Sequence, residues 1–183
     1  MDSSLGLPPG SSTTNLKGNW KFLGMHSKTE SIVELTDGVD VIKTITVSEY
    51  NSKNNTGTLA IDAANMTSTN FGYMVDTTAL GFIYDNNVLI DTVTAPFSFM
   101  LPPSNAVSPY TTVSADSIYF TGGQFVNMGG TSPLNTPTGV KLKFQGDKLF
   151  MTINLTVTDV QISSGIRQST KETVKAVMTY QKI

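Results

Sequence analysis

Asn15-Leu16-Lys17-Gly18-Asn19-Trp20-Lys21-Phe22 is the stretch that decides the fold predicted for this chain. It follows a polar N-terminal segment and contains the only tryptophan of the 183 residues. Side chains alternate between the two faces of a β-strand, so Trp20 and Phe22 would share one face. We expect this stretch to open the first strand of a closed antiparallel β-barrel, with Trp20 filling one end.

The composition fits a single all-β domain with a weakly charged surface. Charged residues make up 14% of the chain, and the formal net charge is −2. Threonine suits pleated surfaces, and asparagine and serine suit turns. The lack of a basic stripe in the sequence argues against nucleic-acid binding. The chain has no cysteine, which excludes disulfides, thiol catalysis and zinc–thiolate sites.

Residues 1–14 are predicted to form a flexible tether ahead of a barrel domain at residues 15–183. They are rich in Gly, Ser and Pro and nearly uncharged, so they would bury little surface. They lack the basic start and apolar centre of a signal peptide. Two interpretations stay open. The segment is either a frayed terminus or the spacer of an exported envelope protein whose lipid anchor lies outside this sequence.

Alternating apolar and polar residues predict the strands. The clearest hairpin turns at Gly146-Asp147, and Asp37-Gly38 and Asp85-Asn86-Asn87 mark further turns. Polar residues predict a loop at 51–57. The spacing of turns gives roughly eight to ten strands, and no segment keeps a helical period. The pattern therefore predicts an all-β, up-and-down antiparallel barrel with little helix, whose closure removes exposed strand edges.

Two segments rich in proline, glycine or both are predicted to be long loops. Residues 95–110 combine four prolines with Phe97, Phe99 and Met100, and proline is disfavoured in a central strand. This loop would either cover the mouth of a cavity or bury its apolar side chains in the core. Residues 129–139 are the second expected loop.

The pattern Asn15-x-x-Gly18-x-Trp20 resembles the first-strand signature of lipocalins and related calycins. The resemblance implies that Gly18 and Trp20 are structural residues of the barrel floor. It also implies that a cationic side chain near the end of the last strand, here Lys182, stacks over the indole. The chain is similar to the lipocalin-like envelope lipoproteins of Bacteroides-type bacteria. That likeness implies a barrel with one open end that holds a small apolar ligand, in the periplasm or on the outer-membrane surface.

Large apolar side chains inside the barrel or on the 95–110 loop would contact such a ligand. A barrel of about eight strands is just wide enough to be filled by side chains or to hold one small ligand. A filled barrel would instead favour a structural or protein-interaction module that uses loops 95–110 and 129–139. The candidate ligand-binding residues are Phe22, Phe97, Phe99, Met100, Phe144, Met151 and Ile153.

Catalysis has weak support in the sequence, so we predict that the protein is not an enzyme. His26 is the only histidine, there is no Gly-x-Ser-x-Gly elbow, and one histidine cannot build a His-based metal site. Glu30 with Glu34, or Asp37 with Asp40, could act as a glycosidase pair, but both pairs flank a turn and should be solvated. A hydrolase is the weakest hypothesis, and no cofactor or metal is expected.

Overall fold

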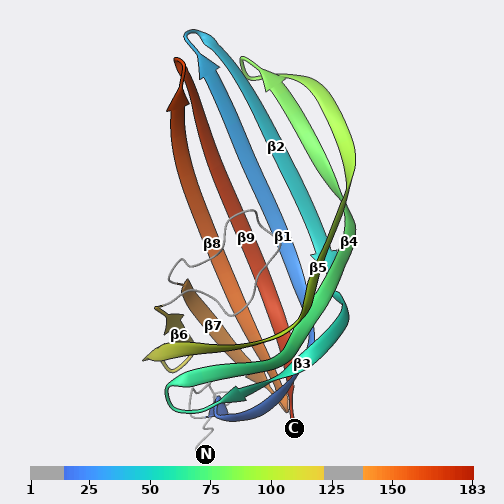
Figure 1. The fold of residues 1–183 in the computed structure, drawn as a ribbon, viewed down its shortest axis with the longest axis vertical. Helices are drawn as coiled ribbons and strands as arrows, with labels where there is room; N and C mark the ends of the chain where they lie inside the picture. Colours follow the sequence, from blue (N-terminus) through green and yellow to red (C-terminus); the bar gives the residue numbers. More distant parts are fainter. Residues whose placement is uncertain (1–14, 122–137) are drawn as a thin grey trace, which may run out of the picture.

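The computed structural model describes residues 15–121 and 138–183, which form one antiparallel sheet that closes into a ring (Figure 1). The strand order is β2-β1-β3-β4-β5-β6-β7-β8-β9, and β1 also pairs with β9. This confirms the predicted up-and-down barrel. β2 and β3 succeed one another along the same wall, because both pair with β1 and with β4. The strands are β1 (Gly18–Asp37), β2 (Asp40–Asn51), β3 (Lys53–Ile61), β4 (Asn65–Asp85), β5 (Val88–Ser114), β6 (Ser117–Phe120), β7 (Thr138–Gln145), β8 (Lys148–Ser163) and β9 (Ile166–Lys182).

The wall of the barrel is complete only around its base. β6 and β7 have 4 and 8 residues, and they pair with residues 110–114 of β5 and residues 148–153 of β8. Beyond these pairings, β5 and β8 each have a partner on one side only, within the part of the chain that the structure describes. Figure 1 shows the result: a closed base, and a tall curved sheet that ends in the β1–β2, β4–β5 and β8–β9 hairpins.

The core fills this base with aromatic and aliphatic side chains. Trp20, Phe22 and Tyr180 are at most 2% exposed. The ring centroid of Phe22 lies 4.5 Å from that of Phe71 and 5.5 Å from that of Tyr180. Each fully buried side chain of this kind contributes about 1.5–3 kcal/mol of hydrophobic stabilisation. The base is therefore a packed core that holds the two ends of the sheet together.

Trp20 lies at the closed end of the base. Its Nε1 donates a hydrogen bond to the carbonyl of Leu16 at 2.9 Å, which satisfies the polar atom of a buried indole. The Nζ of Lys182 lies 5.5 Å from the centre of the Trp20 ring, within cation–π range. Gly18 has φ +128°, which a side chain with a Cβ rarely adopts, and it lets the chain turn beneath the barrel.

Residues 95–110 form a strand, so the predicted loop is wrong. They belong to β5 and pair with β4 from Ala79↔Ala95 to Asn65↔Pro109. Proline is tolerated in an edge strand, because the missing N–H need not face a neighbouring strand. β5 is such an edge above β6 among the described residues. Pro102 and Pro103 fall where the register with β4 shifts, between Leu101 and Ser104.

The predicted loop at 51–57 is also wrong, because Lys53–Ile61 is strand β3. Asn54 and Gly57 have φ of +51° and +105°, and the register with β4 shifts on both sides of Thr56. Asn and Gly accept positive φ at low cost, so the strand continues through its bulges. The predicted loop at 129–139 lies mostly outside the described residues, and its last two residues begin β7.

The predicted short turns are confirmed. Asp37 pairs with Asp40 around Gly38-Val39, and Gln145 pairs with Lys148 around Gly146-Asp147. Asn86 and Asn87 have φ of +48° and +69°, which are values of a two-residue hairpin turn. These turns fix the register of three hairpins.

Gly57→Ala should destabilise the fold. An added Cβ would lie 2.6 Å from Cα of Phe71 and 2.8 Å from the carbonyl oxygen of Asn70, and alanine is strained at this φ. We expect the free energy of unfolding, measured in urea, to fall by about 2 kcal/mol or more. Gly139→Ala is the matched control, because its Cβ would meet no atom within 4 Å. Equal losses in the two variants would contradict the bulge geometry.

Candidate functional site

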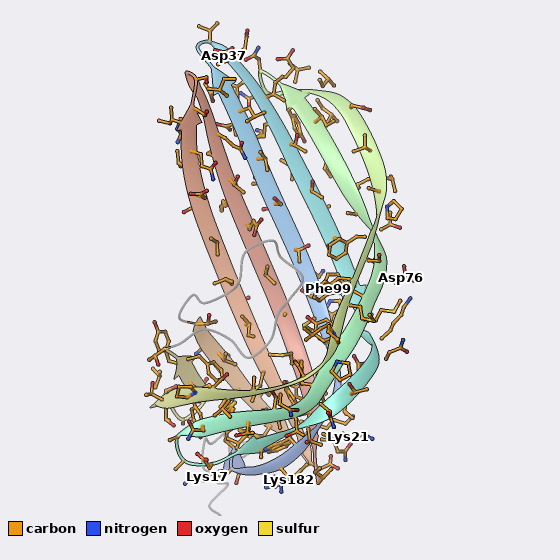
Figure 2. The ribbon with its side chains drawn as sticks, viewed as in Figure 1. Lys17, Lys21, Asp37, Asp76, Phe99 and Lys182 are labelled. Carbon is orange, nitrogen blue, oxygen red and sulfur yellow. The ribbon has the colours of Figure 1, made fainter. Side chains whose placement is uncertain are left out.

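An apolar rim lines the inner face of the sheet where the packed base ends. It consists of Tyr50, Phe97, Phe99, Val157 and Val174, of which the last four are partly buried against the core. The ring centroids of Tyr50 and Phe97 lie 5.9 Å apart. Figure 2 labels Phe99 at the level where the long strands enter the densely filled base. The rim is thus fixed from below by packing: Tyr50 is buried, whereas Phe97 and Phe99 are only partly buried.

Small hydroxyl and aliphatic side chains follow the rim along the inner face. The Oγ1 of Thr29 and the Oγ of Ser48 lie 2.6 Å apart. The next inward residues along the paired strands are Ser31 and Thr46. Such hydroxyls donate and accept hydrogen bonds. The inner face can therefore contact an apolar group at the rim and a polar group above it.

The structure places the candidate ligand-binding residues at different sites. Phe22, Met151 and Ile153 lie within the packed base, at 2%, 0% and 1% exposure. Phe97 and Phe99 belong to the rim and keep part of their surface accessible. Only these two of the five lie where a molecule could reach them without opening the core.

Met100 and Phe144 lie away from the rim. Met100 follows Phe99 on β5, points to the opposite face and is 67% exposed. Phe144 is half-buried at the closed end, with its ring centroid 6.1 Å from that of Trp20. The seven candidates therefore do not form one site.

The phenols near the rim are held in their neutral form. Burial raises the pKa of Tyr50. Burial also raises the pKa of Tyr73 and, further into the base, of Tyr180. The charged form of a phenol is disfavoured in an apolar environment. These groups can donate hydrogen bonds near neutral pH, but they are poor bases there.

The sequence analysis missed a second feature, a hollow of about 560 Å³ on the outer face of β1, β2, β4 and β9. One side is a charged row across adjacent strands, in which Lys28 pairs with both Lys175 and Glu49. Val47 and Leu80 supply its apolar part. The volume lies within the roughly 300–1,000 Å³ typical of ligand pockets. We call this feature the outer hollow.

His26 belongs to the charged surface beside the outer hollow. Its Nε2 lies 3.2 Å from the Oε1 of Glu49, and Nζ of Lys28 lies 3.0 Å from the other oxygen of that carboxylate. The hydrogen bond from Lys28 contributes most to lowering the pKa of Glu49. Ser27 follows His26 in the sequence but faces the interior and is fully buried. The strand therefore places His26 and Ser27 on opposite faces, so the two side chains do not form a Ser–His catalytic pair.

The two carboxylate pairs face solvent. Glu30 and Glu34 lie on the outer face of β1, and Asp37 pairs with Asp40 at the β1–β2 tip. Among residues 15–121 and 138–183, no group of three or more His, Cys, Asp or Glu side chains could hold a metal ion. Over the same ranges, no helix has the length and apolar character needed to cross a membrane.

Comparisons with known proteins do not assign a family. No known protein family matches the chain, and no curated protein matches it either. Among solved structures, the chain is similar to Ail, the attachment invasion locus protein of Yersinia pestis, at 6% sequence identity and a TM-score of 0.18. The match covers 89% of this chain and 99% of the other. A score this low carries no argument about function.

The buried phenols predict a loss of stability at alkaline pH. The pKa of Tyr50, Tyr73 and Tyr180 is raised in the folded state, whereas a tyrosine in the unfolded chain titrates near pH ~10. Above that pH the folded state binds more protons than the unfolded state, so the free energy of unfolding should fall as the pH rises. From about pH 7 to about pH 9 these tyrosines stay protonated in both states, so they should leave the free energy of unfolding nearly constant.

Urea unfolding of the wild type and of Tyr73→Phe across this range and up to about pH 12 tests the prediction. The variant has one fewer phenol to ionise on unfolding, so its stability should fall less steeply above about pH 10. Identical slopes for the two proteins would contradict the burial of Tyr73.

Proposed function

We propose that this protein binds a small apolar ligand, without catalysing a reaction, on the inner face of its barrel. The apolar rim carries this proposal. Phe97 and Phe99 are held by packing against the core, yet they keep accessible surface beside the open part of the wall. Preformed apolar surfaces with a few nearby polar groups are typical of small-molecule sites. Thr29 and Ser48 supply such polar groups.

The expected affinity follows from the apolar surface that a ligand would bury. Each buried CH₂ group contributes about 0.8 kcal/mol. Part of this gain offsets the loss of translational and rotational freedom on association. A chain of about ten carbons would then bind with micromolar affinity.

We also propose that the chain is a lipocalin-like barrel. Gly18, Trp20 and Lys182 support the proposal, because the bend, the buried indole and the stacked ammonium group lie together at the closed end. The rim lies on the other side of the packed base. A ligand would accordingly enter from the open side and stop above the base.

An exported protein tethered at the cell envelope is consistent with this geometry. The described chain starts at the base, next to the end of β9 (Figure 1). A lipid anchor ahead of residues 1–14, outside this sequence, would hold the protein by its base. The hairpins at the other end would then point away from the attachment point.

A structural or protein-interaction module is the second candidate. The packed base supports it, since Phe22, Met151 and Ile153 are buried and leave no surface for a ligand there. A partner would contact the 95–110 segment, where Met100 and Val107 are 67% and 64% exposed. This role places the contacting residues on β5 instead of on a loop.

Phe99→Ala should weaken ligand binding at least tenfold. The matched control is Met100→Ala, because Met100 is the next residue and lies on the other face of β5. Titration with a fluorescent fatty acid, 11-(dansylamino)undecanoic acid, measures both dissociation constants. We expect the control to stay within twofold of the wild type, since Met100 does not face the rim.

The titration also separates the two candidate functions. Absence of saturable binding to the wild type would contradict the ligand-binding proposal. The structural or protein-interaction module would then be the remaining candidate function. Equal weakening in Phe99→Ala and Met100→Ala would contradict the location of the site at the rim.

A further inference from the structure

Above the packed base, the inner face of the sheet carries charges of one sign. Residues that oppose each other in an antiparallel pair share a face of the sheet, so the register shows which charged side chains point inward. Glu172 of β9 lies opposite the inward Ser31 of β1. Asp159 is on the inward row of β8, and Asp91 is on the inward row of β5 that also holds Phe97. Three carboxylates therefore line this face.

Lysine and arginine side chains lie elsewhere on the barrel. All 12 of these residues fall within the described ranges, and the lysines of the base are exposed. The ion pairs among the described residues include none of the three inward carboxylates. The inner face thus presents negative charge without a countercharge. Above the base, the cationic residues on the outward rows are Lys28, Lys43, Arg167, Lys171 and Lys175.

Ser27 gives an independent indication that a molecule binds on the same face. Its side chain is on the inward row at the floor of the rim, opposite Tyr50 and Ala176. It is fully buried, and its Oγ has no hydrogen-bond partner among the described residues. Buried hydroxyl groups are normally paired. An unpaired hydroxyl at the floor of the proposed site therefore indicates that a ligand completes this environment.

We propose that the ligand is a positively charged amphiphile, a long-chain amine, and this inference rests on the proposed binding of an apolar ligand at the rim. The carbon chain packs against Phe97 and Phe99, and the ammonium group lies beside Glu172 and Asp159. Val157 connects the two regions, because it belongs to the rim and lies opposite Glu172 in the β8–β9 register.

The charge of the head group decides which amphiphiles this face prefers. A cleft lined by charges of one sign concentrates ligands of the opposite sign. An ammonium group gains charge-assisted hydrogen bonds to a carboxylate, and the hydroxyl of Ser31, opposite Glu172, can accept a further one. A carboxylate head group would meet like charges and no cation, and it is costly to move an unpaired charge out of water. Fatty acids should therefore bind through their chains, but more weakly than amines.

Competition among three ligands of equal chain length tests the inference. Decylamine, decanol and decanoic acid are compared as competitors that displace 11-(dansylamino)undecanoic acid from the wild type at about pH 7, where the amine is positive and the acid negative. Decylamine should bind at least tenfold more tightly than decanoic acid, with decanol between them. Added salt should reduce this ratio, because exposed charges are screened.

Glu172→Gln should lower the amine-to-acid affinity ratio at least fivefold and leave the affinity for decanol within twofold of the wild type. The matched control is Glu34→Gln, because Glu34 is also a partly buried glutamate of the sheet but faces outward. It should leave the ratio within twofold. Asp159→Asn should lower the ratio too, and it tests the same contact should Glu172→Gln unfold. Phe99→Ala should weaken all three ligands by a similar factor, since it removes a contact with the chain.

Two results would overturn the inference and leave ligand binding at the rim intact. One is equal affinity for the amine and the acid. The other is a preference for the amine that Glu172→Gln and Glu34→Gln change equally. Absence of saturable binding of the dansyl probe would instead contradict the proposed function itself, and the inference with it.

Discussion

The antiparallel pairing of β1 with β9 is the constraint on which the rest of the structure depends. It runs from Trp20↔Lys182 to Asp37↔Ile166 and joins the first strand to the last. Since this pairing closes the ring, the described strands leave no free edge at the base, and Trp20 lies beneath the Lys182 side chain. The contact is also among the longest-range in sequence, and long-range β-pairing makes folding slow. The last residues of the chain therefore complete the core.

The same sheet has two environments because β6 and β7 are short. At the base, aromatic side chains fill the barrel, and the fold obtains most of its hydrophobic stabilisation there. Beyond β6 and β7 the sheet is tall and solvated on both faces, so local opening should be easiest near the hairpin tips. The rim lies at the border between the two environments, where side chains are both positioned by packing and accessible. This border position is why we propose the rim as the site of ligand binding.

Local features of the sequence predicted the barrel well. The alternating rows around Gly146-Asp147 and the turn at residues 85–87 identify hairpins, because strand period and turn chemistry are read from neighbouring residues. The prolines of residues 95–110 led to the wrong prediction of a loop. A strand at the edge of a sheet accepts proline, and whether a strand lies at an edge depends on the whole sheet. Phe97 and Phe99 were predicted as ligand-binding residues on a loop, whereas they belong to strand β5. The outer hollow was missed, since the adjacency of Lys28 and Lys175 depends on the register between the first and last strands.

Fluorescence of the single tryptophan tests the central claim most directly, because Trp20 is the only indole in the chain. Its side chain is buried beneath the β1–β9 closure, so acrylamide should quench the folded protein far less than the urea-unfolded chain. The emission of the folded protein should also be shifted to shorter wavelength. Equal quenching of the folded and unfolded chains would place the indole in water and contradict the closed barrel.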